Sequence, residues 1–390
     1  MIKKMINLMH YPFLIIQYCV FFIIGKIGKK DKNLWLLSER KYDARDNAWH
    51  FFRFLREKHP EINCAFVIDK ASPDFQKVQA IGRCIQPNTI EHHLAFARSE
   101  AKISTHIMGN APDTYRYTMI DRYLNLIKGK KIMLQHGING NAPIALHYPR
   151  ARLDLLVCST VSEYEMIRKE FGHPEGVAQL IGLCRFDKLL LPHEIKRQIL
   201  IMPTWRIFLR DISNESFMES DYYKCFNGLL TNDAFLSLLE KYDLKAVFYI
   251  HIELQSYSSL FNSMSERVEI KTLGEADVQE LLMESQLLIT DYSSVFFDFA
   301  YMDKPVLYWE FDEDVFYSKQ YKRGQFDARY DGFGPVIGTK EVKPILDFIE
   351  EEEKNNMQVL PMYKERIDRC FSDRHNNNCE RTFEAIKGLF

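Results

Sequence analysis

"LLITDYSSVFFDFAYMDKPVLYW", residues 287–309, contains one complete strand, helix and strand succession. An apolar run of strand length, 287–290, leads through a short polar turn into a helix-like stretch, and a second apolar run ends at Trp309. Continuous apolar runs are typical of strands that are buried on both faces of a parallel sheet. The stretch therefore predicts an α/β fold, with the polar turn at the carboxyl end of a strand.

The residues of this turn favour a binding site over a simple helix cap. Where a strand passes into a helix, backbone N–H groups are left unpaired and can bind an anion. Ser293 and Ser294 add hydroxyl donors, although either can instead cap the helix. Asp291 is expected to hold a hydroxyl, a ribose or a basic group, because a carboxylate does not favour an anion. Helix capping alone does not explain why Thr290, Asp291, Ser293 and Ser294 occur together. Asp298 lies one helical turn after Ser294 and is expected to order the turn from behind.

The same alternation of apolar runs and amphipathic stretches occurs twice along the chain, which predicts two doubly wound domains. The expected joint is "LLLPHEIKRQ", residues 189–198, where a proline and charges interrupt the pattern. We expect domains at 31–193 and 194–390. The runs expected to form strands are 34–38, 64–69, 102–106, 131–135, 153–159 and 178–183 in the first half, and 198–203, 245–250, 267–271, 286–290 and 305–309 in the second.

Residues 1–30 are expected to form a membrane-associating segment. "YPFLIIQYCVFFII", residues 11–24, follows Lys3 and Lys4 and precedes a lysine cluster at 26–32. As a helix this run is roughly 21 Å long at about 1.5 Å per residue, shorter than the roughly 30 Å of a bilayer core. An interfacial helix and a spanning helix that includes residues 5–10 both fit. A cleaved signal peptide is disfavoured by the lysines at its expected cleavage site, and a helix packed on the protein body is the remaining alternative.

Composition excludes several classes of function. The chain has 390 residues, is 46% hydrophobic and 27% charged, and carries a formal charge of −2, so it has no overall positive field for nucleic acid. Eight cysteines are scattered without a C-x-x-C pair. We therefore expect buried thiols in a reducing compartment and no zinc site.

Several motifs in order resemble one family. "TDYSSVFFDFAYMDKPVLYW" resembles the signature of the CDP-glycerol glycerophosphotransferases, the enzymes of teichoic acid and capsule synthesis. The resemblance covers residues 34 to about 370, and chance agreement over that length is improbable. The other motifs that carry it are "LQHGI" at 134–138, "GLCRFDKL" at 182–189, "MPTWR" at 202–206, "YKRGQFD" at 321–327 and "GFGPV" at 332–336.

The resemblance implies two Rossmann-like domains of glycosyltransferase-B type, with the CDP-alditol held mainly by the second domain and the acceptor approaching from the first. The implied reaction moves glycerol phosphate or ribitol phosphate from the CDP-alditol to a hydroxyl of a membrane-linked glycan or polyol phosphate, and releases CMP. It implies no metal and no cofactor, since the CDP-alditol is the donor substrate. His136 is the implied general base, and Gly137 beside it lets backbone approach a ligand.

The resemblance also implies a set of donor-binding residues. Arg185, Arg206, Ser293 and Ser294 are expected to stabilise the transferred phosphoryl group, because positioning and electrostatics dominate this chemistry. The Thr204 hydroxyl can contact a phosphate or cap a helix.

Two positions depart from the family pattern. His251 resembles the family's second histidine, which helps to hold the pyrophosphate, but Ile252 replaces the usual proline after it. Cys184 replaces the proline usual before Arg185. Gly140 is a further glycine of the loop that follows His136 and is equally consistent with ordinary turn chemistry.

Two rival functions remain open. One is a sugar-nucleotide glycosyltransferase of the same architecture, and the other is an inert membrane-associated scaffold of a polysaccharide assembly complex. A metal-dependent transferase needs a D-x-D motif, and Asp312 to Asp314 reads as an exposed acidic loop. Glycerol versus ribitol, the identity of the acceptor, single addition versus polymerisation and the oligomeric state also stay open. We expect the protein at the cytoplasmic face of a bacterial membrane, because CDP-activated donors are cytosolic and the lysines obey the positive-inside bias.

Overall fold

The computed structural model describes residues 2–27, 33–138, 143–320 and 332–390 and divides into two compact units. The first unit is Met1–Lys188 together with His375–Phe390, and the second is Leu189–Arg374. The division falls at the edge of the predicted joint, but the predicted second domain, 194–390, is too long at its C-terminal end. Gly140 and the segment 321–327 lie outside the described residues.

The first unit contains a seven-stranded sheet in the order β3-β2-β1-β4-β5-β6-β7, and every described pairing in it is parallel. Its strands are β1 (Trp35–Ser38), β2 (Cys64–Val67), β3 (Arg83–Ile85), β4 (Ala101–Ser104), β5 (Lys130–Met133), β6 (Leu155–Cys158) and β7 (Ala178–Leu180). Its helices are α1 (Ile2–Ile27), α2 (Asn47–Lys58), α3 (Phe75–Gln79), α4 (Ile90–Arg98), α5 (Thr114–Leu124), α6 (Val161–Glu170), α7 (Phe186–Leu189) at the boundary, and α16 (Asn378–Lys387).

The second unit contains a six-stranded parallel sheet in the order β10-β9-β8-β11-β12-β13. Its strands are β8 (Gln198–Ile201), β9 (Lys245–Tyr249), β10 (Val268–Lys271), β11 (Leu287–Thr290), β12 (Val306–Trp309) and β13 (Val336–Ile337). Its helices are α8 (Asn214–Met218), α9 (Asp221–Leu230), α10 (Asp233–Lys241), α11 (Val278–Glu284), α12 (Val295–Tyr301), α13 (Glu313–Lys319), α14 (Lys343–Lys354) and α15 (Pro361–Cys370).

The apolar runs of the sequence explain these sheets. Every run that we expected to form a strand overlaps one, and the strands of the opening stretch, β11 and β12, are buried along their whole length. The structure adds two strands that were not predicted, β3 and β13. Both are edge strands of two or three residues with partly exposed side chains, so they carry no apolar pattern that a sequence reading can detect.

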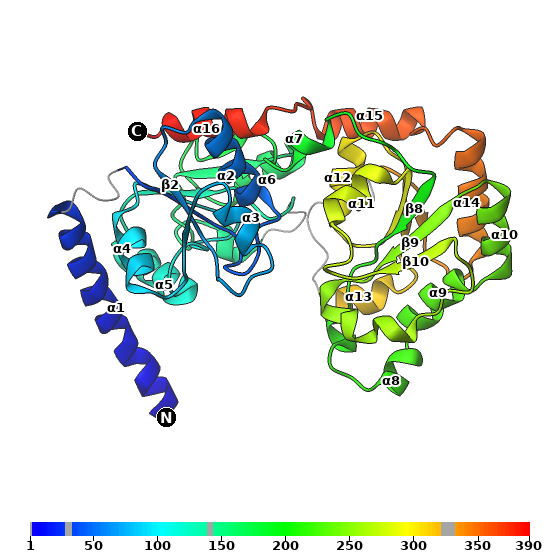
Figure 1. Ribbon diagram of the computed structural model, residues 1–390, viewed down its shortest axis with the longest axis horizontal. Helices are drawn as coiled ribbons and strands as arrows, with labels where there is room; N and C mark the ends of the chain where they lie inside the picture. The colour runs from blue at the N-terminus through cyan, green and yellow to red at the C-terminus, as the bar shows by residue number, and fades with distance from the viewer. Residues whose placement is uncertain (1, 28–32, 139–142, 321–331) are drawn as a thin grey trace. The chain divides into compact units, whose positions relative to one another are not determined.

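The C-terminal helix α16 belongs to the first unit, where it packs beside α2 although the two are far apart in the sequence (Figure 1). Both backbone N–H groups at its start, of Asn378 and Cys379, donate to the carboxylate of Asp187. Phe383 lies in the apolar core of the unit with Trp35. These contacts join distant segments, which is why the sequence pattern alone did not show them.

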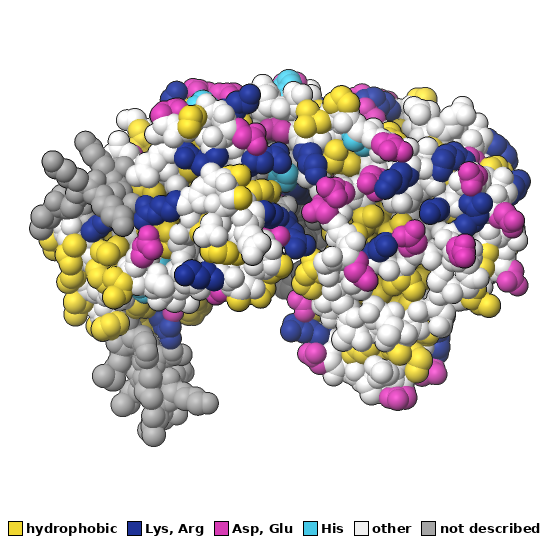
Figure 2. Space-filling view, viewed as in Figure 1, with side chains coloured by type: hydrophobic (Ala, Val, Ile, Leu, Met, Phe, Trp, Pro, Cys, Tyr) yellow, Lys and Arg dark blue, Asp and Glu magenta, His cyan; other side chains and the backbone are white. Residues whose placement is uncertain are grey.

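The N-terminal helix α1 packs on the first unit through one side. Leu14 and Tyr18 are buried against α4 and α5, and the backbone N–H of Lys128 donates to the Tyr18 hydroxyl at 2.8 Å. Figure 2 shows apolar side chains gathered along the outer side of the described part of this helix. The exposed ones are Phe13, Ile16, Val20, Ile23 and Ile24. Among the described residues, no helix is both long and apolar enough to cross a membrane.

All eight cysteines are free thiols, and six of them are buried. Cys184, which replaces a family proline, is one of these. The Cys184 thiol lies 3.6 Å from the Thr382 hydroxyl of α16, and the Cys379 thiol lies 3.5 Å from the carbonyl oxygen of Cys184. The substitution therefore places a small buried side chain at the contact with α16.

One close backbone contact generates a stability prediction for the second unit. A Cβ added to Gly334 would lie 1.6 Å from the carbonyl oxygen of Val306 in β12. Gly334→Ala must therefore displace backbone, and we expect it to cost about 1–3 kcal/mol and to lower the melting temperature by several degrees. Gly338→Ala is the matched control because its added Cβ meets nothing within 4 Å. Equal thermal melts for the two variants would contradict this packing.

Candidate active site

The first unit holds His136 at the carboxyl edge of its sheet, in the segment that follows β5. The His136 Nδ1 lies 2.5 Å from the carboxylate of Asp46, which occupies the N-cap position of α2. Arg185 donates from Nη1 to the other oxygen of Asp46 at 3.1 Å and to the carbonyl oxygen of His136 at 2.8 Å. Asp46 thus holds the imidazole of His136, and Arg185 holds both Asp46 and the His136 backbone.

The charge on Asp46 decides which nitrogen of His136 can act as a base. Burial alone raises the pKa of Asp46, but the hydrogen bond from His136 and the positive charge of Arg185 outweigh it and hold the pKa below its usual range. An ionised Asp46 can only accept, so Nδ1 of His136 is the donor in this contact, and in the neutral imidazole the lone pair lies on Nε2. The His136 side chain is 59% exposed.

The backbone just before His136 is held in a strained conformation. Gln135 has a φ of 62°, in the left-handed region that residues other than glycine and asparagine rarely adopt. Its buried side-chain amide donates to the carbonyl oxygen of Val157 at 2.8 Å and to Glu163 at 2.9 Å, and its own carbonyl accepts from Asn47. Such strain persists only where surrounding contacts enforce it, and it is concentrated at functional sites.

Two further side chains complete the surroundings of Asp46 and His136. Glu39 is buried and accepts backbone N–H groups at the start of α2, including that of Asp46 itself. Burial and the nearby charge of Asp46 raise the pKa of Glu39 to about 8. His106 stacks on His136 with ring centroids 5.4 Å apart, and burial, His136 and Arg40 lower its pKa to about 4. Near neutral pH His106 is therefore an uncharged neighbour.

In the second unit, Arg206 lies inside a buried ion-pair network. Its guanidinium donates to Asp291 at 2.9 Å and, through two nitrogens, to both oxygens of Asp312 at 2.8 Å. The side chain is 0% exposed and stacks against the rings of Tyr292 and Phe316. Burial by itself lowers the pKa of Arg206, yet the two carboxylates hold it above its usual range. This geometry corrects the expected phosphate contact, because the enclosed guanidinium has no side left for a ligand.

Asp291 fixes the turn of the opening stretch onto a neighbouring strand. One carboxylate oxygen accepts the backbone N–H of Thr204 at 2.8 Å and that of Tyr292 at 2.6 Å, while the other accepts from Arg206. Of the three partners expected for Asp291, the structure thus shows the basic group. The Thr290 hydroxyl donates to the carbonyl oxygen of Met202 and is buried, so its expected contact with a ligand is also corrected.

The other turn residues remain accessible to a ligand. Ser294 is exposed at the N-cap position of α12, but its side chain makes no capping hydrogen bond. The Ser293 hydroxyl accepts the backbone N–H of Val295 at a long 3.5 Å.

His251, which follows β9, is half-buried. Its ring accepts the backbone N–H of Glu253 and stacks on Trp205 with ring centroids 6.0 Å apart.

Comparison with known proteins decides the family. Residues 19–388 match the family described as CDP-Glycerol:Poly(glycerophosphate) glycerophosphotransferase. The chain belongs to this glycerophosphotransferase family. It is 30% identical over 369 residues to the minor teichoic acid biosynthesis protein GgaB of Bacillus subtilis, covering 92% of this chain and 40% of GgaB. A teichoic acid poly(glycerol phosphate) polymerase of the same organism is 30% identical over 52% of this chain and 26% of the polymerase. The chain thus spans less than half of either relative.

Solved structures agree with the α/β fold of this glycerophosphotransferase family member. The wall teichoic acid polymerase TagF superposes with a TM-score of 0.69 and 17% identity, covering 98% of each chain. A UDP-GlcNAc 2-epimerase from Neisseria meningitidis gives a TM-score of 0.55 and 12% identity, covering 91% of this chain and 99% of the epimerase. At these identities the likeness concerns the fold alone.

The structure groups the predicted site residues differently from our expectation. His136, Gly137 and Arg185 lie together in the first unit, but Arg185 binds Asp46 instead of standing free for a phosphate. Thr204, Arg206 and Asp291 form one network in the second unit. Asp298 is 4% exposed and lies on α12, and its expected role in ordering the turn stays a prediction.

Sequence reasoning missed Asp46, His106 and the role of Asp312. Asp46 stands just before α2 and resembles an ordinary helix cap in the sequence, which gives no sign of its distant partner His136. Asp312 was noted only as part of a D-x-D in an acidic loop, whereas it binds Arg206. Within the described ranges, no group of three His, Cys, Asp or Glu side chains is arranged to hold a metal ion.

The buried network predicts that Arg206 acts through stability. Arg206→Met would leave Asp291 and Asp312 buried without a counter-charge, which we expect to cost about 3–5 kcal/mol. Ser294→Ala, at an exposed position of the same site, is the control and should leave the melting temperature unchanged. Thermal and urea unfolding of the three proteins measure the effect. If Arg206→Met were as stable as the wild type and bound the nucleotide more weakly, that result would contradict the structural role and support the expected contact of Arg206 with a phosphate.

Proposed function

We propose that the chain transfers glycerol phosphate or ribitol phosphate from a CDP-alditol to a hydroxyl of a membrane-linked glycan or polyol phosphate, in teichoic acid or capsule synthesis. The acceptor oxygen attacks the alditol-bearing phosphorus and forms a new P–O bond. The P–O bond to CMP breaks, CMP leaves with the bonding electrons, and the hydroxyl proton passes to His136 Nε2. The contact of His136 with Asp46 is the observation that carries this proposal.

Asp46 and Arg185 act on the reaction through His136. Asp46 keeps the proton on Nδ1 and stabilises the imidazolium that forms when Nε2 takes the acceptor proton. Arg185 keeps Asp46 ionised and fixes the His136 backbone. The strained Gln135 contributes by holding the segment in the one conformation that presents the ring.

The donor is proposed to bind at the second unit, in an arrangement of glycosyltransferase-B type. Ser293 and Ser294 supply hydroxyl donors to its phosphates, and Thr204 and His251 lie at neighbouring strand ends. The network of Arg206, with both of its carboxylates, supports this turn from inside. No metal or cofactor is part of the proposed reaction, because protein donors carry the charge stabilisation that phosphoryl transfer needs.

We infer a location at the cytoplasmic face of the membrane from the lysine cluster at 26–32, and helix α1 supports contact with a membrane surface. Its inner side is fixed to α4 and α5, which leaves the exposed apolar side chains on one outward face. A helix with this distribution lies in the membrane interface without crossing it.

The first prediction of this proposal concerns CMP release. Purified protein incubated with membrane extract and a chelator should release CMP from CDP-glycerol or CDP-ribitol, and the release should require the acceptor. UDP-sugars are tested in parallel, and UDP release without CMP release would replace the proposal by a sugar-nucleotide transferase.

His136→Ala should abolish turnover and leave CDP-alditol binding intact, whereas Asp46→Asn should lower kcat by about 100-fold or more with little change in KM.

A second prediction concerns the turn at Ser293 and Ser294. The double variant Ser293→Ala, Ser294→Ala should weaken CDP-alditol binding by about tenfold and lower the rate as well, because both hydroxyls contact phosphate before and during transfer. Equilibrium binding of the CDP-alditol measures the first effect separately from catalysis. Normal donor affinity in this variant would reduce the turn to a helix N-terminus without a role in binding.

A further inference from the structure

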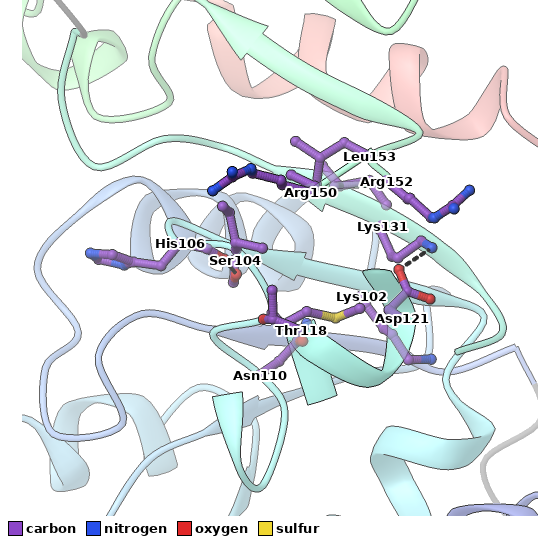
Figure 3. Close-up of a pocket in the computed structure, with 14 residues that line it drawn as sticks. Lys102, Ser104, His106, Asn110, Thr118, Asp121, Lys131, Arg150, Arg152 and Leu153 are labelled. Atoms are coloured by element: carbon purple, nitrogen blue, oxygen red, sulfur yellow. Dashed lines mark hydrogen bonds and ion pairs between the residues drawn. The ribbon is translucent and has the colours of Figure 1, made fainter. Parts of the chain in front are cut away.

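A polar pocket of the first unit has no part in the mechanism described so far. It lies on one face of the sheet, between β4, β5, α5 and the segment that precedes β6 (Figure 3). In that view the side chains of Arg150 and His106 extend to one side of the pocket, and the ion pair of Lys131 with Asp121 lies at the other.

Positive charge dominates the lining of this pocket. Lys102, Lys131, Arg150 and Arg152 line it, against a single carboxylate, that of Asp121. Asp121 is already engaged, because it accepts from Lys131 at 2.8 Å. The Arg150 guanidinium makes no hydrogen bond or ion pair with any residue in the described part of the chain. An excess of cations that the protein does not balance favours an anionic ligand.

Lys102 is a buried lysine at the inner side of this pocket. Its ammonium donates to the carbonyl oxygen and the hydroxyl of Ser99, both at 2.9 Å, and within the described residues it has no carboxylate at hydrogen-bond distance. Burial and the charge of Lys131 lower the pKa of Lys102 to about 7.

A second feature of the pocket points to a ligand that also carries hydroxyl groups. Among the described residues the buried side-chain oxygen of Asn110 has no hydrogen-bond partner, while its amide nitrogen donates to the carbonyl oxygens of Leu36 at 3.0 Å and Ile103 at 3.5 Å. These donations fix the side-chain orientation, so the oxygen remains the acceptor. A buried acceptor without a partner is costly, and a ligand hydroxyl can satisfy it.

The pocket lies next to the proposed general base. His106 lines it and stacks on His136 with ring centroids 5.4 Å apart. A ligand seated at Arg150 and Asn110 therefore lies one side chain away from the imidazole that takes the acceptor proton.

We propose that this pocket binds the phosphate-bearing end of the acceptor, a terminal polyol phosphate, with its phosphate on Arg150 and one of its hydroxyls on Asn110. This inference rests on the proposed function, because it assigns the acceptor of that reaction to a site. It also makes the enzyme select acceptors that already carry an alditol phosphate over neutral glycans.

Binding tests the site without any turnover. sn-Glycerol 3-phosphate, n-propyl phosphate and glycerol are titrated into the full-length protein by calorimetry or NMR. We expect glycerol 3-phosphate to bind several-fold more tightly than propyl phosphate, which lacks the hydroxyls, and glycerol to bind least. Arg150→Gln should weaken glycerol 3-phosphate binding about tenfold. Arg53→Gln is the matched control, since Arg53 is a surface residue of the same unit that pairs only loosely with Glu57 at 3.6 Å.

Kinetics then connect the site to the reaction. With a phosphate-bearing acceptor, Arg150→Gln should raise the acceptor KM about tenfold and leave the CDP-alditol KM unchanged. With a neutral acceptor, the variant should behave as the wild type does.

The outcomes separate this inference from the proposed function. Suppose that the wild type transfers the alditol phosphate, and that Arg150→Gln and Arg53→Gln have the same glycerol 3-phosphate affinity and the same acceptor KM. That result would overturn the pocket assignment and leave the proposed reaction unaffected. Arg150-dependent binding of glycerol 3-phosphate without any CMP release would support a polyol phosphate site and overturn the reaction. Equal binding of glycerol 3-phosphate and propyl phosphate would overturn the role of Asn110.

Discussion

The hydrogen bond between His136 and Asp46 joins parts of the first unit that are distant in sequence. Asp46 begins α2, His136 follows β5, and Arg185, which binds both, follows β7. Parallel strands bring these segments to one sheet edge, because every strand of the unit runs in the same direction. The proposed chemistry depends on this contact, because an ionised Asp46 places the proton of a neutral His136 on Nδ1 and the lone pair on Nε2. The strained Gln135 and the buried Glu39 are both explained as supports of this one pair.

Three arginines show how burial decides the function of one residue type. Arg206 is enclosed by two carboxylates and stabilises the second unit. Arg185 is partly enclosed and orients a neighbour. Arg150 has no charged partner within the described residues and is the one proposed to bind a substrate. Their positions in motifs favoured Arg206 and Arg185 as phosphate ligands. A motif indicates that an arginine is needed at a position, but it does not show which groups that arginine contacts.

Sequence patterns predicted the two α/β units well, because buried parallel strands are continuous apolar runs. They failed at β3 and β13, which are too short and too exposed to give a pattern, and at α16, whose partners lie across the chain. In the site, the roles of His136 and of the turn at Ser293 were inferred from their motifs and stay predictions. Asp46 and Asp312 were missed, since the identity of an acidic side chain's partner is a property of the tertiary structure. The same reason explains the correction at Thr290.

The return of α16 to the first unit affects the order in which the protein can fold during synthesis. The second unit is one continuous segment, so all of its strands are available once Arg374 has left the ribosome. The first unit is interrupted by it, and its apolar core includes Cys379, Phe383 and Ile386. That core stays incomplete until translation reaches α16, so the inserted unit can form before the unit that contains it, the reverse of the usual N-terminal-first order.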